Sequence, residues 1–257
     1  IKYIDKDKIK LAKLDSKNNK ILGNIKGYNN KLFNFTGPRA YLGSNEKNLF
    51  LITGTGLLYQ TEISAFDQKK DVFLKEIKTN ILRIFKNYRI DNTDELERSA
   101  MVKSILLHKG KVYISATVKV NENCYQQKIF SGKVDLKKIH FNEFFKIRDC
   151  RTFYNNTSGG NIVYFKDNKI LYTLGDWKSC QYLDQYPKNF CREKGPQNLK
   201  STYGKILSID LDTKKFEFVS TGHNNPQGIT FNKNRNIIFS AEHGPQGGDE
   251  VNINDLS

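Results

Sequence analysis

The feature that most constrains the fold is a short apolar run that recurs along the chain. Each copy begins at a polar turn, continues with aliphatic and aromatic residues, and ends in small or hydroxylated residues. The copies are residues 48–53, 111–116, 169–174 and 236–241. β-Branched and aromatic residues bounded by turn residues are typical of strands. A regular interval of roughly 60 to 70 residues is typical of a protein built from repeated units.

A second pattern lies between these runs and predicts β-hairpins. Residues 130–136 precede 137–141, and residues 203–211 precede 214–218, each pair with the pattern strand, polar turn, strand. One inner strand plus one outer hairpin is most of a four-stranded blade, so we predict an all-β chain that folds as a β-propeller with about four blades. An all-β sandwich is the competing architecture, but it would not be expected to show so regular a repeat.

We expect one propeller domain over residues 1–257, a length sufficient for a substantial core. The short stretch 253–257 offers little material for ring closure, so we expect the ring to be incomplete at the C-terminus. Helical signals are weak. Residues 94–101 and 66–84 show some helical spacing, and both are equally compatible with strands that have a charged face.

The net charge of +15 comes from lysines scattered among asparagines through every segment. This pattern is typical of a solvated lysine-rich surface, and it lacks the arginine stripe of a nucleic-acid groove. We therefore expect no nucleic-acid partner, with acidic polymers as a weaker hypothesis. No apolar run approaches the 18 residues or so that span a bilayer, so we expect no membrane span.

The four cysteines have separated spacings and no Cys-x-x-Cys pair. This favours two local disulfides over a metal site. Cys124 and Cys150 bracket a hairpin-like segment, and Cys180 and Cys191 bracket a polar loop. Such bonds predict a periplasmic or extracellular location. The alternative is four unrelated buried thiols.

Two polar turns, residues 222–228 and 242–250, flank the last apolar run and predict a binding site on strand ends. In the first turn, Asn225 and Gln227 are two residues apart, so in an extended segment both point to one side. Amides both donate and accept hydrogen bonds, which suits quinone or carboxylate oxygens and sugar hydroxyls. The alternative is a turn whose asparagine caps its own backbone.

The second turn contains Gly244 and Pro245, which free the backbone and remove an amide donor, so carbonyl oxygens can face a common point. Calcium takes such oxygens together with carboxylates such as Asp249 or Glu250. The alternative is an ordinary loop between blades that an aspartate caps.

The two turns resemble the Gly-His-Arg-Asn-Pro-Gln-Gly and Glu-His-Gly-Pro-x-Gly-Gly-Asp-Glu-x-Asn signatures of the soluble pyrroloquinoline-quinone-dependent glucose/sorbosone (aldose sugar) dehydrogenases. Gly159 and Gly160, residues 170–176 and residues 204–211 resemble the preceding blade of that family, in the same order. The resemblance covers about residues 157–252. It implies a six-bladed propeller with calcium and the quinone at the top of its channel.

The resemblance also implies roles for individual residues. The carbonyls of Gly244 and Pro245, helped by Asp249, would hold calcium. Asn225 and Gln227 would lie against the cofactor and the sugar, and Asp176 would orient the catalytic base. A sugar substrate and an external electron acceptor follow from the same resemblance.

The chain departs from the family's pattern at three other positions. The family's His-x-Gly-Gly-Arg is Thr157 to Asn161 here, so the expected base is Thr157, and its hydroxyl cannot accept a proton near neutral pH. General-base assistance of roughly 10²- to 10⁴-fold would be lost. Asn161 and Asn224 stand where two arginines would face the anionic cofactor.

Four histidines are candidates to replace the missing base. We expect His108 and His140 at the surface, and His223 and His243 lie within the two signatures. Two hypotheses follow. The first is a quinoprotein that oxidises an aldose at C1 with pyrroloquinoline quinone and calcium. The second is a non-catalytic exported propeller that binds a carbohydrate or a protein partner, which the three departures favour.

Overall fold

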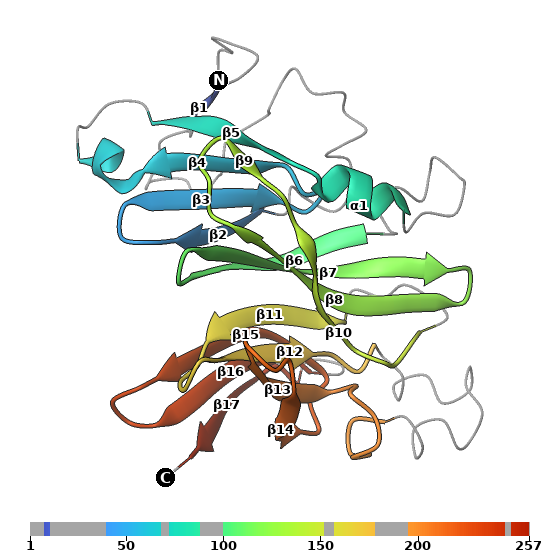
Figure 1. Cartoon of the computed structure of the whole chain (residues 1–257). Helices are drawn as coiled ribbons and strands as arrows, with labels where there is room; N and C mark the ends of the chain where they lie inside the picture. Colours follow the sequence, from blue (N-terminus) through green and yellow to red (C-terminus); the bar gives the residue numbers. More distant parts are fainter. Residues whose placement is uncertain are drawn as a thin grey trace.

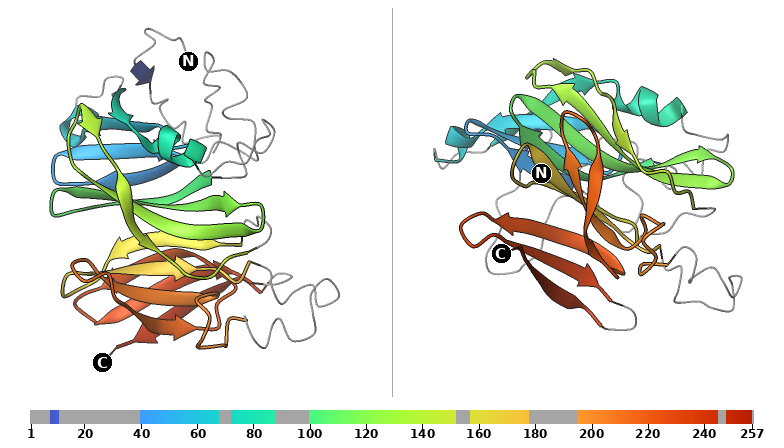
Figure 2. Two further views of the ribbon diagram at one scale, coloured as in Figure 1. Left: turned by 45° about the vertical axis from the view of Figure 1, so that its right-hand side comes forward. Right: turned by 60° about the horizontal axis from the view of Figure 1, so that its bottom comes forward.

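The computed structural model describes residues 8–10, 40–67, 72–87, 100–151, 157–177, 195–244 and 248–256. Within these ranges the strands form four sheets, which follow one another in chain order and stack face to face (Figure 1). Both views of Figure 2 show the same succession, with the β15–β17 sheet at the far end from the β2–β5 sheet.

Each sheet is assembled mainly from strands that are consecutive in the chain. The first has the order β1 (Lys8–Lys10), β5 (Phe73–Thr79), β4 (Leu58–Glu62), β3 (Asn48–Thr53), β2 (Ala40–Ser44). The second is β10 (Asn142–Lys146), β8 (Cys124–Lys133), β7 (Lys111–Asn121), β6 (Ala100–His108). The third is β11 (Gly159–Tyr164), β12 (Lys169–Leu174), β13 (Lys205–Asp210), β14 (Phe216–Thr221). The fourth is β15 (Asn225–Asn232), β16 (Ile237–His243), β17 (Glu250–Asp255).

The four strands β2, β6, β11 and β15, here called the inner strands, connect the sheets. β2 contacts β6, β6 contacts β11, and β11 contacts β15, so the same edge of every sheet faces the same region. Sheets that meet through equivalent edges are the blades of a propeller. The prediction of an all-β propeller is confirmed, and the described residues contain four blades.

The core lies between the blades. One cluster of buried apolar side chains fills the space between the first and second sheets, a second cluster the space between the second and third, and a third cluster the space between the third and fourth. On β12, Ile170 and Tyr172 belong to the second cluster, whereas Leu171 belongs to the third. Because successive side chains of a strand point to opposite faces, a strand between two neighbouring blades is apolar on both.

The recurring apolar runs are therefore not the inner strands. They correspond to β3, β7, β12 and β16, the second strand of each blade. β7 and β12, which lie between two blades, are buried on both faces, whereas β3 and β16 in the end blades alternate between buried and more exposed positions. The inner strands are richer in glycine and polar residues, as in Gly159, Gly160 and Asn161 of β11.

The two predicted hairpins have different outcomes. The hairpin at residues 203–218 is confirmed as β13 and β14, which pair antiparallel. Residues 137–141 do not return along β8. They contain β9 (Lys138–Ile139), which crosses to the first sheet and pairs in parallel with β5. The partner of β8 is β10 instead.

Helix is scarce among the described residues. The 66–84 stretch contains the end of η2 (Ile63–Phe66), β5 and the start of α1 (Ile81–Asn87), so it is both strand and helix. Most of residues 94–101 lies outside the described residues, and Ala100 and Met101 begin β6. The described part of the chain contains no helix long and apolar enough to cross a membrane.

Cys124 and Cys150 form a disulfide, as predicted. It joins the start of β8 to the segment before Arg151, where the backbones of Tyr125 and Arg151 exchange hydrogen bonds. Cys180 and Cys191 lie outside the described residues.

Candidate ligand-binding site

The turn that leads into β15 lies against the end of β12. The backbone N–H of Asp176 donates to the carbonyl of Asn224 at 2.7 Å, and Asn224 Nδ2 lies 3.5 Å from Asp176 Oδ2. Gly222 precedes the turn with φ +91°, which favours glycine. Two residues 48 positions apart, one from the first signature turn and one from the end of β12, thus meet between the third and fourth blades.

The glycine pair of β11 lies beside the same turn. The N–H of Gly159 donates to Asn225 Oδ1 at 3.1 Å. Gly160 has φ +108°, and a Cβ placed there would be 2.6 Å from Cβ of Lys103 on β6. Glycine is therefore needed at position 160 for the inner strands to approach one another.

Thr157 lies beside Asp176. Its side chain is buried, and its carbonyl accepts the N–H of Trp177 at 2.9 Å. The structure therefore brings Thr157, Asp176, Asn224 and Asn225 together at one end of the third and fourth blades.

Asn161 links three inner strands. Its Oδ1 accepts from Ser104 Oγ on β6, and its Nδ2 donates to the carbonyl of Gln227 on β15, both at 2.8 Å. Both ends of the amide are thus engaged by the protein. Ser104 was missed by sequence reasoning, and a lone serine in an apolar strand gives no signal of this role.

Asp176 directly precedes Trp177, which belongs to a buried aromatic cluster with Tyr125 and Tyr203. Arg151 stacks on the Tyr203 ring, with Cζ 3.5 Å from the centroid, and its Nη2 donates to the Asp176 carbonyl at 3.1 Å. An arginine over an aromatic face gains cation–π attraction when it is desolvated. Arg151 was also missed by sequence reasoning, although it directly follows a bonded cysteine.

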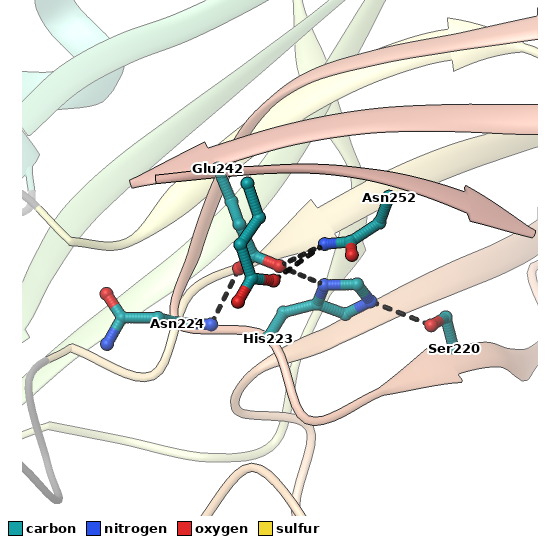
Figure 3. A network of polar contacts seen from close by, with 6 residues as sticks. Ser220, His223, Asn224, Glu242 and Asn252 are labelled. Atoms are coloured by element: carbon teal, nitrogen blue, oxygen red, sulfur yellow. Dashed lines mark hydrogen bonds and ion pairs between the residues drawn. The ribbon is translucent and has the colours of Figure 1, made fainter. Parts of the chain in front are cut away.

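His223 and Glu242 connect the two signature turns (Figure 3). His223 Nδ1 lies 2.9 Å from Glu242 Oε1, and His223 Nε2 lies 2.8 Å from Ser220 Oγ. Glu242 also accepts the Asn224 N–H at 2.7 Å and Asn252 Nδ2 at 2.7 Å. Burial alone raises the pKa of Glu242. The His223 contact and the backbone hydrogen bonds of Asn224 and Asn225 outweigh it, so the pKa is lowered overall.

The loop after β16 is held by Asp249. Gly244 N–H donates to Asp249 Oδ1 at 3.2 Å, and His243 Nδ1 lies 3.4 Å from Asp249 Oδ2. A Cβ at Gly244 would lie 1.7 Å from the Gly248 carbonyl oxygen, so only glycine fits. This geometry matches the alternative of a loop capped by an aspartate. Pro245 lies outside the described residues.

The described residues contain no group of three or more His, Cys, Asp and Glu side chains arranged to hold a metal. A calcium site here would rest on backbone carbonyls, as the resemblance implies. Asp249 has the right chemistry for such a site, but its two oxygens already contact the Gly244 N–H and His243 Nδ1. The described residues therefore fit calcium only in part.

A hollow of about 360 Å³ opens beside this loop, over the fourth sheet. It is lined by Gln227, Gly228, Ala241, Glu242, His243, Asp249, Glu250 and Val251. The strand register shifts between Pro226 and Gly228, and Gln227 is exposed whereas Asn225 is buried. Because a bulge breaks the two-residue alternation, the two amides do not share one side as the sequence had indicated.

The remaining histidines lie elsewhere. His108 ends β6, where its ring stacks on Tyr164 with centroids 4.2 Å apart. Burial and the charge of Lys109 lower the pKa of His108. His140 is exposed.

Amides, a carboxylate and a glycine pair from two neighbouring blades thus meet at one end of this propeller. Its family is given by the sequence match. Residues 101–255, more than half of the chain, match the family described as Glucose / Sorbosone dehydrogenase, and the chain belongs to this family.

Two curated relatives are similar to parts of the chain. Quinoprotein glucose dehydrogenase B of Acinetobacter calcoaceticus is 31% identical over an alignment of 111 residues, and the match covers 37% of this chain and 23% of the relative. Aldose sugar dehydrogenase YliI of Escherichia coli (strain K12) is 29% identical over 119 residues, 42% of this chain and 31% of the relative. The matched segments thus span less than a third of either relative.

Solved structures share the fold. A structure named glucose dehydrogenase has a TM-score of 0.59 at 18% identity. The match covers 84% of this chain and 64% of that one. The soluble aldose sugar dehydrogenase of Escherichia coli in the apo-form has a TM-score of 0.58 at 16% identity, covering 85% of this chain and 60% of that one. At these identities the likeness concerns the fold alone.

The polar groups at the blade ends fit an oxygen-rich ligand through amides. Gln227 is exposed on the hollow, and the Asn224 side chain is only partly buried. Asn161 and Asn225 are already hydrogen-bonded to neighbouring protein atoms, so they hold neighbouring strands together at the site.

Proposed function

We propose that this chain is a sugar-dehydrogenase quinoprotein that oxidises an aldose at C1, with pyrroloquinoline quinone and calcium. The observation that supports this most is the contact of Asn224 with Asp176. It joins the first signature turn to the segment 170–176, which resembles the family's preceding blade, at one end of neighbouring blades. Because the matched relatives are much longer than the matched segments, the activity is a proposal for this chain.

In this proposal the protein binds and orients its ligands through named groups. Asn224 and Gln227 would bind oxygens of the cofactor and the sugar, because amides can donate and accept. Asn161 and Asn225 would hold Gln227 and Gly159 in place. The carbonyls of Gly244 and Pro245, with Asp249, would hold calcium. Bound quinone would supply the hydride acceptor, chemistry that no side chain offers.

Catalysis is expected to be slow because of Thr157. Oxidation at C1 requires the departing hydroxyl proton to be accepted, and a threonine hydroxyl cannot accept it near neutral pH as imidazole can. Asp176 would be the orienting acid, but the group that it would orient is absent from position 157.

Thr157 and Asn161 also favour a second candidate, a non-catalytic exported propeller that binds a carbohydrate or a protein partner. The Asn161 amide is hydrogen-bonded at both ends, and it carries no positive charge that could attract an anionic quinone as an arginine at this position would. The Cys124–Cys150 disulfide supports a periplasmic or extracellular location for either candidate.

Cofactor titration separates the two candidates. The protein is titrated with pyrroloquinoline quinone and calcium, and the cofactor spectrum and dye reduction with aldoses are followed. We expect a shifted spectrum with slow dye reduction, and Thr157→His should speed turnover by roughly 10²- to 10⁴-fold.

Thr157→Val, which restores no base, is the matched control and should stay as slow as the wild type. An unshifted spectrum would reject the quinoprotein proposal. An increase of the melting temperature by a sugar would then support the binding candidate.

A further inference from the structure

The buried carboxylate of Glu242 receives hydrogen bonds from four donors. They are His223 Nδ1, Asn252 Nδ2, and the backbone amides of Asn224 and Asn225. Glu242 lies on β16, whereas Asn224 and Asn225 lie where the chain enters β15. None of the roles proposed above uses Glu242.

An ionised carboxylate fits this set of donors because it only accepts. A glutamine of the same shape would offer one oxygen and an NH₂ group. Its NH₂ group would face N–H donors, and at least one of the four donors would be left unsatisfied. The arrangement thus selects a negative charge at position 242.

His223 is held in one orientation by its two partners. Since Glu242 can only accept, His223 Nδ1 must donate to it, and Nε2 then shares a proton with Ser220 Oγ. Hydroxyl, imidazole and carboxylate stand in the order of a nucleophile triad. Ser220, however, pairs with Ile206, whose side chain lies in the core between the third and fourth blades. Ser220 also does not line the hollow, so the three groups act as a clamp between blades.

The clamp controls backbone atoms that face the site. While Glu242 binds the N–H groups of Asn224 and Asn225, the Asn224 carbonyl receives the Asp176 N–H, and Asn225 Oδ1 receives the Gly159 N–H. Moving the Asn224–Asn225 turn would therefore move the contacts with Asp176 and Gly159 together.

We propose that Glu242 is a positioning residue that, clamped by His223 and Ser220, presets the Asn224–Asn225 turn in the ligand-free protein. Its consequence for ligand affinity rests on the proposed function, whereas its effect on the turn does not.

The first test measures amide hydrogen exchange by NMR in the ligand-free protein. In Glu242→Gln, exchange at Asn224 and Asn225 should accelerate about 10- to 100-fold, since a charged acceptor is lost. Core amides such as Leu171 and Ile206 should not change. Glu217→Gln, the same substitution at an exposed carboxylate on β14, is the control and should leave all of these amides as in the wild type.

A Glu242→Gln protein that exchanges at Asn224 and Asn225 within about twofold of the wild type overturns the proposal. So does equal acceleration of every amide in the fourth sheet. Should Glu242→Gln not fold, Ser220→Ala decides instead, because it removes only the outer partner of His223. It should accelerate the same two amides about two- to tenfold, and no selective effect there overturns the proposal.

The second test titrates wild type, Glu242→Gln and Glu217→Gln with pyrroloquinoline quinone. We expect binding about tenfold or more weaker in Glu242→Gln alone. Equal affinity in all three counts against positioning for the ligand. If none of them, the wild type included, binds the quinone, the proposed function fails, and the exchange measurement still decides the role of Glu242.

Discussion

At the scale of single residues, Lys205 shows how burial changes protonation. The side chain is fully buried on β13, and its Nζ donates to the carbonyls of Tyr203, at 2.9 Å, and Pro196. Desolvation lowers the pKa of Lys205 to about 8, although the charge of Asp149 works in the opposite direction. The folded protein therefore loses this proton at a lower pH than the unfolded chain, where a lysine has a pKa of about 10.4.

This difference predicts a pH dependence of stability. Between about pH 8 and pH 10 the unfolded state binds one more proton at Lys205 than the folded state, so the free energy of unfolding rises with pH. Below about pH 8 both states hold the proton, and the contribution is constant. Measured by urea unfolding, the stability of the wild type relative to Lys205→Met should be greater at about pH 9.5 than at about pH 7.

Lys215→Met, at an exposed lysine next to the same hairpin, is the control and should show no comparable rise. A Lys205→Met difference that stays flat or falls over this pH range would contradict the burial argument.

At the scale of elements, the sequence located the buried strands better than the strands that carry the site. β12 was recognised because Ile170, Leu171 and Tyr172 are buried on alternate faces and form a continuous apolar run. β11 and β15 have no such run, since they open with glycine, asparagine and proline. The residues of β11 were found through motif resemblance, and those of β15 through the density of polar turn residues as well.

The contacts within the site were less accessible to sequence reasoning. The Ser104–Asn161 bond joins residues 57 positions apart, and the bulge before Gly228 turns Gln227 away from the side of Asn225. The first depends on how blades approach one another and the second on strand pairing within the fourth blade, and no local pattern encodes either. Thr157 and Asp176 were predicted as neighbours by resemblance, and their segments do lie side by side.

The hydrogen-bonded connection across the inner strands supplies a prediction at this scale. Ser104→Ala should destabilise the protein by about 1 kcal/mol, and Asn161→Ala, which also releases the Gln227 carbonyl, by about 1 to 3 kcal/mol. The double variant should lose less than the sum, with a coupling energy of about 0.5 to 2 kcal/mol. Urea unfolding of the four proteins measures this cycle. Strict additivity would mean that Ser104 and Asn161 do not interact in solution.

At the scale of the whole molecule, the propeller architecture extends over more of the chain than the family match does. The family match begins at residue 101, yet the described residues before it form five strands of the first sheet, with their own share of the first core cluster. Phe50, Ile52 and Leu58 are fully or almost fully buried there against the second blade. The repeat of apolar runs predicted this blade, because packing against a neighbouring blade requires an apolar second strand in each, and β3 buries alternate residues.

The disulfide ties the second blade to the site of the third. Cys150 is bonded to Cys124 across 26 positions, and the adjacent Arg151 stacks on Tyr203 and donates to the Asp176 carbonyl. A crosslink of this span restricts the unfolded chain, a contribution of about 3 to 4 kcal/mol in the chain-entropy model.

We expect Cys124→Ser with Cys150→Ser to lower the free energy of unfolding by about this amount in urea. The comparison is made with and without reductant, because Cys180 and Cys191 remain in both proteins. The difference between wild type and double variant should shrink in reductant, and a difference that persists unchanged would show that the bond does not carry this stability.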